Sequence, residues 1–425
     1  MSSQSVALYR QSQVLEGELG DALLTLETRP GFAGWEAITP AQQLLAAEAE
    51  IGAGERVLIL PCGHGALGVW LASETRADEG ILLDTNIVAV QVAQRNLEAT
   101  RATRVSARAG LPGDVPGPFD VVLMTLPKGR ELARLHFLAA YRALREGGRL
   151  YLAGANKEGI KSTIKDAEAL FGPSMLLAYR RSNRVVQFIK EAREEPLPEM
   201  YRVPGMEAGT YAHYDITVQG STYAIRSRPG VFSWHDLDPG TAMLLDDLEV
   251  HPSDEVLDVG TGYGIIGLHV AQRIGAEQVT LVDVDLLAVE SAKETLRANH
   301  MEGVEVVLGD GVAAAGEREF SLIVSNPPFH SGHAQEAKMV QALIAEAFAA
   351  LRPRGRLVLV ANRFLPYNRS MERVFGSVET LAQDTRYHVL SATKRYQRKA
   401  RGKPPKARRQ DAGDAGEETI YEIES

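Results

Sequence analysis

The chain has 425 residues, a formal net charge of −9 and 45% hydrophobic residues, which allows two or three domains with real cores. The negative charge argues against a protein that wraps nucleic acid over its whole surface, although it permits a local basic surface. The single cysteine excludes an internal disulfide framework and predicts a cytoplasmic protein. We find no pattern of a signal peptide and no apolar segment of membrane-spanning length, so the sequence predicts no contact with a membrane.

The N-terminal half predicts a parallel α/β sheet. Residues 57–60, 81–83 and 119–124 are apolar runs of strand length. The first run is followed by a short turn that contains Cys62 and His64. Because two such residues complete neither a metal site nor a nucleophile site, we interpret them as packing residues and expect no metal centre.

The middle of the chain predicts a linker and a hairpin. Residues 191–207 are charged and rich in proline, which is typical of a linker between domains at 1–190 and 208–393. Residues 214–226 alternate about a Gly-Ser turn and therefore predict a β-hairpin. A helix is expected over residues 242–248, where it would cap a pocket of the second domain.

The second half predicts three strands that end in candidate binding groups. Residues 255–259 lead into a glycine-rich turn and a helix over 265–271, which lets a ligand approach the backbone amides. Residues 279–283 end in Asp283, an acid suited to ribose hydroxyls. Residues 306–310 end in Asp310, which is placed to meet an adenine amino group.

A fourth strand, at residues 322–324, leads into the most informative segment of the chain. It is followed by Asn326, Pro327, Pro328, Phe329 and His330. An amide carbonyl and a backbone carbonyl can each accept a hydrogen bond from one N–H of an aromatic amino group. These two hydrogen bonds hold the nitrogen so that its lone pair is free to attack. The prolines remove competing backbone donors, and Phe329 offers a flat face on which a base can stack.

The two halves form an internal repeat. Residues 57–68 align with 256–267, and residues 119–128 align with 320–329. The N-terminal copy has Ile59 in place of Asp258, and a Thr-Leu-Pro-Lys segment in place of Asn-Pro-Pro-Phe. We therefore expect a catalytically dead N-terminal copy that supports folding or holds substrate.

In this order, the glycine turn, the two acids and Asn-Pro-Pro-Phe resemble the class I S-adenosylmethionine-dependent methyltransferases that act on amino nitrogens. With the dead copy, the hairpin and a Val-Phe-Ser segment followed by Leu-Asp-x-Gly, the chain resembles the ribosomal RNA guanine-N2 methyltransferases, most closely the small-subunit branch. The resemblance implies two tandem Rossmann-like domains, S-adenosyl-L-methionine as cofactor, and methyl transfer to the N2 amino group of a guanine in 16S rRNA.

The resemblance also implies the residues of the site. Those implied to hold the cofactor are Phe232, Thr241, Asp258, Gly260, Thr261, Gly262, Gly264, Asp283, Asp310 and Asn326, with Asp258 near the methionine amino group. Those implied to act in catalysis are Asn326, Pro327, Pro328, Phe329 and His330.

The C-terminal segment, residues 394–425, is first basic and then acidic, which predicts a disordered tail. The expected partner is the small ribosomal subunit or its assembly intermediate, bound by a monomer. Three alternatives stay open: guanine-N2 methylation of 23S rRNA, N-methylation of a protein glutamine amide, and a non-catalytic RNA-binding assembly factor.

Overall fold

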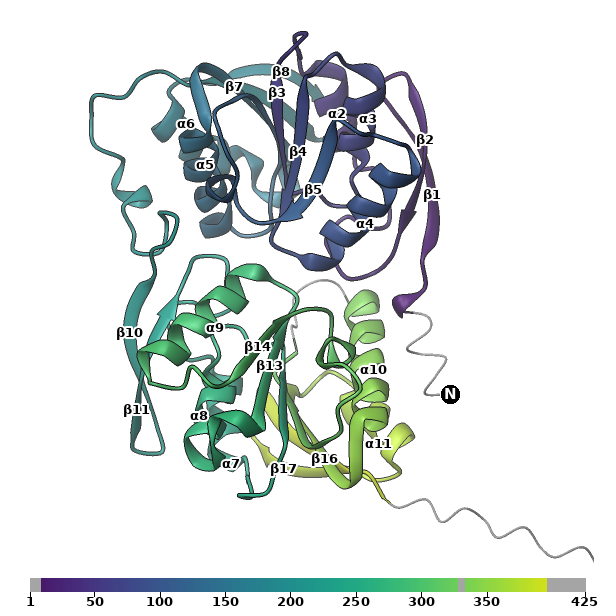
Figure 1. Cartoon of the computed structure of the whole chain (residues 1–425), viewed down its shortest axis with the longest axis vertical. Helices are drawn as coiled ribbons and strands as arrows, with labels where there is room; N and C mark the ends of the chain where they lie inside the picture. The colour runs from purple at the N-terminus through teal and green to yellow at the C-terminus, as the bar shows by residue number, and fades with distance from the viewer. Residues whose placement is uncertain (1–8, 328–332, 396–425) are drawn as a thin grey trace, which may run out of the picture.

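The computed structural model describes residues 9–327 and 333–395, and it contains two seven-stranded sheets with the same strand order. The order is β5-β4-β3-β6-β7-β9-β8 in the first half and β14-β13-β12-β15-β16-β18-β17 in the second. The two halves lie one above the other along the long axis of the molecule (Figure 1). The expected fold, two tandem Rossmann-like α/β domains, is confirmed.

The N-terminal sheet follows the predicted apolar runs. Its strands are β3 (Arg56–Leu60), β4 (Glu79–Asp84), β5 (Val105–Ala109), β6 (Phe119–Thr125), β7 (Leu144–Ala155), β8 (Met175–Arg180) and β9 (Asn183–Ile189). Its helices are α2 (Pro40–Glu48), α3 (Ala66–Glu74), α4 (Ile87–Ala99), α5 (Arg130–Ala143) and α6 (Ile160–Phe171).

The second sheet repeats this arrangement. Its strands are β12 (Val256–Val259), β13 (Val279–Asp283), β14 (Glu305–Leu308), β15 (Phe320–Ser325), β16 (Leu351–Asn362), β17 (Glu379–Gln383) and β18 (Tyr387–Thr393). Its helices are α7 (Pro239–Asp247), α8 (Ile265–Ile274), α9 (Leu286–Ala298), α10 (His333–Ala350) and α11 (Tyr367–Phe375).

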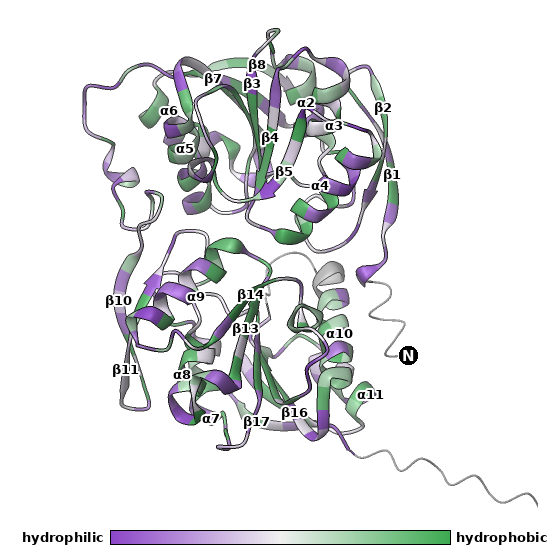
Figure 2. Ribbon diagram, in the orientation of Figure 1, coloured by the Kyte–Doolittle hydropathy of each residue, from purple (hydrophilic) through white to green (hydrophobic). Residues whose placement is uncertain are grey.

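Central strands in both sheets are apolar because helices cover both of their faces, as expected for parallel sheets. Strands β3, β6, β12 and β15 are almost wholly buried, and β12 pairs in parallel with β13 and β15. Figure 2 shows this contrast between hydrophobic strand interiors and helices of mixed hydropathy. The packing places the carboxyl ends of β12, β13 and β15 side by side, which is where open α/β sheets bind ligands.

Two hairpins flank the sheets. The first is β1 (Gln13–Leu19) with β2 (Ala22–Thr28), and the second is β10 (Ala212–Val218) with β11 (Ser221–Ser227). The second agrees with the hairpin expected from the alternation at 214–226. Within the proline-rich segment between the sheets, Tyr201 is fully buried and donates a hydrogen bond to Asp166 O at 2.6 Å. This segment is therefore anchored to the first half by packing.

The two halves meet through the loops that follow β4 and β13. Ile87 N donates to Val284 O at 3.0 Å, and Leu286 N donates to Thr85 O at 2.8 Å. The Thr85 hydroxyl adds a hydrogen bond to Asp285 Oδ2 at 3.1 Å. These reciprocal backbone bonds join equivalent loops of the two copies, so they fix the first half against the ligand-binding edge of the second.

Some element boundaries differ from expectation. Helix α7 begins at Pro239 instead of 242, because Asp238 caps it by accepting a hydrogen bond from Thr241 N at 2.8 Å. Strand β14 ends at Leu308, so Asp310 lies in the loop beyond it. Among the helices of residues 9–327 and 333–395, none is long and apolar enough to cross a membrane.

Candidate active site

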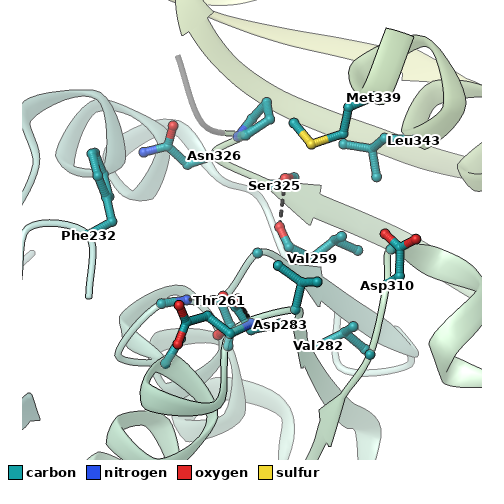
Figure 3. Close-up of a pocket in the computed structure, with 18 of the residues that line it drawn as sticks. Phe232, Val259, Thr261, Val282, Asp283, Asp310, Ser325, Asn326, Met339 and Leu343 are labelled. Carbon is teal, nitrogen blue, oxygen red and sulfur yellow. Dashed lines mark hydrogen bonds between the residues drawn. The ribbon is translucent and has the colours of Figure 1, made fainter. Parts of the chain in front are cut away.

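A cavity of about 320 Å³ lies at the carboxyl ends of β12, β13 and β15. This volume is within the range of pockets that hold small ligands. Most of its lining comes from the second half, but Tyr9, Arg10 and Gly31 come from the first. Figure 3 shows Asn326 and Phe232 on one side of the cavity and Asp310 on the other.

The glycine-rich turn after β12 leaves space where side chains would otherwise stand. Gly260 and Gly262 have φ of +74° and +57°, and a Cβ on either would meet nothing within 4 Å. Both glycines line the cavity, so a ligand can come close to the backbone there. Gly267 serves packing instead, because a Cβ there would lie 2.4 Å from Leu281 Cδ1.

Asp258 lies beneath this turn and is not among the residues that line the cavity. Its Oδ2 accepts hydrogen bonds from Thr261 Oγ1 at 2.7 Å and from Gly267 N at 3.0 Å. Its Oδ1 is buried and has no hydrogen-bond partner among the described residues. Burial raises the pKa of Asp258 to about 6. Asp258 thus holds the turn in shape, and its expected contact with a methionine amino group stays a prediction.

Asp283 ends β13 and lines the cavity. Its Oδ2 accepts a hydrogen bond from Gly262 N at 2.9 Å, and its Oδ1 accepts one from Asp285 N at 3.0 Å. Since an ionised carboxylate offers about four acceptor positions, about two are left for a ligand. Burial raises the pKa of Asp283 to about 7, so its charge state changes close to neutral pH.

Asn326 follows β15 and is oriented by α7. Its Nδ2 donates to Thr241 Oγ1 at 2.7 Å and to Asp238 Oδ2 at 3.1 Å. Because an ionised carboxylate only accepts hydrogen bonds, the amide nitrogen must face Asp238. Oδ1 of Asn326 then points away as a buried acceptor without a partner among the residues the structure describes. A buried acceptor of this kind is suited to an incoming N–H group.

Aromatic side chains form the wall beside Asn326. Phe232, on the loop between β11 and α7, is 45% exposed and lines the cavity. Tyr263 also lines the cavity, and its hydroxyl is held by Asp236 O at 3.0 Å. Phe232 therefore combines partial exposure with a position next to Asn326, which suits contact with a flat ligand.

Across the cavity from Asn326, Asp310 lies near apolar side chains. Val259, Val282, Met339 and Leu343 lie around this end, and Asp310 presents its carboxylate to it (Figure 3). This combination of apolar walls and one acceptor is suited to a base that carries an amino group.

The structure thus brings together most of the expected site residues in one cavity. Those that line it are Phe232, Thr241, Gly260, Thr261, Gly262, Asp283, Asp310, Asn326 and Pro327. Gly264 lies against Ala292, outside the lining. Pro328, Phe329 and His330 lie outside the described residues.

Sequence reasoning missed Asp238 as the residue that orients Asn326. The available signal was the Asp-Pro pair before α7, which indicates a helix cap but not a partner 88 residues away. It also missed Tyr9, Arg10 and Arg29, which contact Asp310 from the first half. No local pattern marks these three as site residues.

The equivalent position in the first half is occupied by packed side chains. Cys62 and His64 are buried, and His64 Nε2 lies 3.2 Å from Ala37 O. Gly63 N donates to Asp84 Oδ2 at 3.2 Å, as Gly262 N does to Asp283 in the second half. Among the described residues, no group of three or more metal-ligating side chains is found.

Comparison with known proteins identifies the same repeat. The Methyltransferase small domain family matches the chain twice, over residues 23–186 and 222–391. A solved structure of the T. thermophilus 16S rRNA N2 G1207 methyltransferase in complex with AdoMet and guanosine is similar to this chain. It is 34% identical with a TM-score of 0.76, and the match covers 92% of this chain and 100% of that chain.

Curated relatives agree with the solved structure. The ribosomal RNA small subunit methyltransferase C of Pseudomonas entomophila (strain L48) is 35% identical over 302 residues, which are 71% of this chain and 86% of the relative. That of Pseudomonas aeruginosa (strain LESB58) is 36% identical over 276 residues, 65% of this chain and 80% of the relative. The chain therefore belongs to the ribosomal RNA small subunit methyltransferase C family, with a Methyltransferase small domain in each half.

Proposed function

We propose that this protein methylates the N2 amino group of a guanine in 16S rRNA, with S-adenosyl-L-methionine as the methyl donor. Membership of the family supports the reaction, and the cavity of the second half supports its location. The observation that carries the proposal is the buried, unpartnered Oδ1 of Asn326, oriented by Asp238 and Thr241.

The residues of the cavity fit the cofactor. Gly260 and Gly262 leave room beside the backbone, and Asp283 has acceptor positions left for ribose hydroxyls. Asp310 lies among apolar side chains that suit the faces of an adenine, and the free Oδ1 of Asp258 suits a buried amino group near the turn. When bound, the cofactor supplies a methyl group on a positively charged sulfur.

Asn326 acts on the guanine. Its Oδ1 accepts a hydrogen bond from one N–H of the N2 amino group, and the Pro327 carbonyl is proposed to accept a hydrogen bond from the other N–H. Together they hold the nitrogen closer to tetrahedral, so its lone pair is less delocalised into the ring. Because Asp238 and Thr241 already fix the amide, little reorganisation is needed at this point of the reaction.

The guanine has to leave its stack to enter the cavity. Phe232 is placed to contact it, and Phe329 is proposed to stack on it. As the bond from the amino nitrogen to the methyl carbon forms, the bond from that carbon to sulfur would break and its electron pair would stay on sulfur. The nitrogen becomes positively charged, so its N–H groups become stronger donors to Asn326 Oδ1. One proton then leaves the nitrogen, and His330 is a candidate to receive it.

The first half is proposed to support folding and substrate binding instead of catalysis. Ile59 occupies the position of Asp258, and Thr125 that of Asn326. The proposed substrate form is the small ribosomal subunit or an assembly intermediate, bound in the cytoplasm by a monomer. Residues 1–190, 191–207, 208–393 and 394–425 are the proposed functional units.

One experiment separates this function from its alternatives. In three separate reactions, the purified protein is incubated with radiolabelled methyl donor and one candidate substrate. The candidate substrates are 30S subunits, 50S subunits and a peptide release factor. We expect label in 16S rRNA alone, recovered as N2-methylguanosine after nuclease digestion. Label in 23S rRNA or in protein would replace the proposed substrate, and binding to 30S subunits without label would support an assembly factor. The Asn326→Ala variant serves as the control with strongly reduced activity.

A further inference from the structure

Asp238 holds both the start of α7 and Asn326 through one carboxylate oxygen. Its Oδ2 accepts hydrogen bonds from Thr241 N at 2.8 Å, from Thr241 Oγ1 at 3.3 Å and from Asn326 Nδ2 at 3.1 Å. Asp238 lines the cavity and is only 8% exposed. A carboxylate therefore lies directly behind the amide whose Oδ1 is proposed to meet the guanine.

The fold leaves space for this carboxylate. A Cβ on Gly240 would lie 3.0 Å from Asp238 Oδ2 and 3.2 Å from the ring of Tyr387, so a larger residue would displace one of them. Asp238 is also the cap at the N-terminus of α7, where the helix dipole stabilises a negative charge. The start of α7 thus provides a place for a negative charge in the cavity wall.

The N-terminal copy shows that capping the helix does not require this charge. Its equivalent helix, α2, also begins with a capping residue followed by a proline, so Thr39 aligns with Asp238. The Thr39 hydroxyl accepts a hydrogen bond from Gln42 N at 3.2 Å and so caps α2 without a charge. The same copy has Thr125 in place of Asn326. Of the two copies, the one that has the amide also has the carboxylate.

The proposed reaction moves a positive charge toward this carboxylate. As the bond from the amino nitrogen to the methyl carbon forms, the carbon–sulfur bond breaks with its electron pair left on sulfur, so the positive charge passes from sulfur to nitrogen. A negative charge on the side of the nitrogen stabilises the transition state more than the ground state. Asp238 lies on that side, because it bonds Asn326, which lies across the cavity from Asp310 (Figure 3).

The carboxylate also acts on the amide itself. Hydrogen bonds to an ionised group are stronger than those between neutral groups, and successive hydrogen bonds polarise one another. Because Asn326 Nδ2 donates to Asp238, electron density shifts toward Asn326 Oδ1. This oxygen then accepts more strongly from an amino group that gains positive charge.

We propose that the negative charge of Asp238 accelerates methyl transfer through Asn326, in addition to orienting the amide. The proposal rests on the proposed function, in which Asn326 Oδ1 accepts a hydrogen bond from the N2 amino group of a guanine. Orientation needs only an acceptor at position 238, whereas acceleration needs a charge there. Asp238 is a positioning residue, since it acts on the guanine through Asn326.

The test removes the charge and keeps the acceptor. Asparagine caps helices as well as aspartate does, and in Asp238→Asn its side-chain oxygen can still accept from Thr241 N and Asn326 Nδ2. Methylation of 30S subunits is measured in a single turnover with saturating labelled cofactor, and we expect a rate lower by about tenfold or more. In calorimetry, the affinity for S-adenosylhomocysteine should stay within about twofold of the wild-type value, because a change confined to the transition state leaves binding unaltered.

Three further variants separate charge from structure. Asp238→Thr places the neutral cap of the N-terminal copy at this position, should lower the rate in the same way, and replaces Asp238→Asn if that variant does not fold. Thr39→Ala removes the equivalent cap outside the cavity lining and should leave the rate unchanged. In an Asn326→Ala background, Asp238→Asn should lower the rate by less than about twofold, because the amide through which the charge acts is gone.

Three results would overturn the proposal. A wild-type rate in Asp238→Asn would show that Asp238 serves only as an acceptor and a cap. An equal loss of S-adenosylhomocysteine affinity would assign the effect to the shape of the cofactor site. An undiminished effect in the Asn326→Ala background would show that the charge does not act through Asn326. Absence of label from 16S rRNA with the wild-type protein would instead refute the proposed function, and the inference with it.

Discussion

Removal of the Asn326 side chain is the sharpest test of the proposed chemistry. The variant Asn326→Ala deletes the free Oδ1 acceptor and leaves Asp238 and Thr241 without the amide that bonds both of them. The lost hydrogen bond is strongest when the amino nitrogen carries positive charge. Loss of one preorganised hydrogen bond to developing charge typically costs about 3 kcal/mol, which corresponds to a rate about a hundredfold lower.

The assay is a single-turnover measurement with saturating 30S subunits and methyl-labelled cofactor, so that product release does not limit the rate. Cofactor affinity should stay within about a few-fold, since Asp283 and Asp310 lie elsewhere in the cavity. The matched control is Thr125→Ala, at the aligned position of the N-terminal copy, and its rate should equal that of the wild type. A near-normal rate for Asn326→Ala would refute the role of its carbonyl.

Three further predictions address the cofactor site and the tail. Asp283→Ala should weaken S-adenosylmethionine binding by about tenfold or more, whereas Asp84→Ala should not. Calorimetry that finds two cofactor sites per chain would refute the interpretation that the N-terminal copy is catalytically dead. The pKa of Asp283 is raised to about 7, so its carboxylate is lost below that pH and affinity should fall as the pH is lowered from about 8 to about 5. The variant Asp283→Asn should remove most of this slope, and an unchanged slope would assign it to another group. Deletion of residues 394–425 should flatten the dependence of log RNA affinity on log salt without a change in the methylated guanine, and identical slopes would remove the tail from RNA binding.

Much of the site could be predicted because its parts are encoded in short segments. The glycine-rich turn, Asp283 and Asn326 each follow an apolar run of strand length, and parallel strands place their carboxyl ends at one edge of a sheet. The resemblance that these motifs carry led to the correct family, and the internal repeat predicted two sheets of one topology.

The orientation of individual side chains could not be predicted in this way. Asp258 holds the turn in shape, because its Oδ2 accepts hydrogen bonds from Thr261 and Gly267, and its place at the end of an apolar run does not indicate these contacts. Asp238 belongs to the segment before α7, and only the fold brings its Oδ2 within 3.1 Å of Asn326 Nδ2. Such contacts depend on how a helix end packs against a strand end, which no periodic pattern specifies.

The sequence by itself determined the repeated α/β fold, the family and the chemistry of the groups at the strand ends, because strand periodicity and turn composition are local properties of the chain. The tertiary structure decided that the N-terminal half supplies part of the wall of the cavity in the C-terminal half. Tyr9, Arg10 and Arg29 carry no motif, and they reach Asp310 only because the β4 and β13 loops dock. That docking depends on the combined shape and hydrogen bonding of two folded surfaces, which exist only after each half has folded.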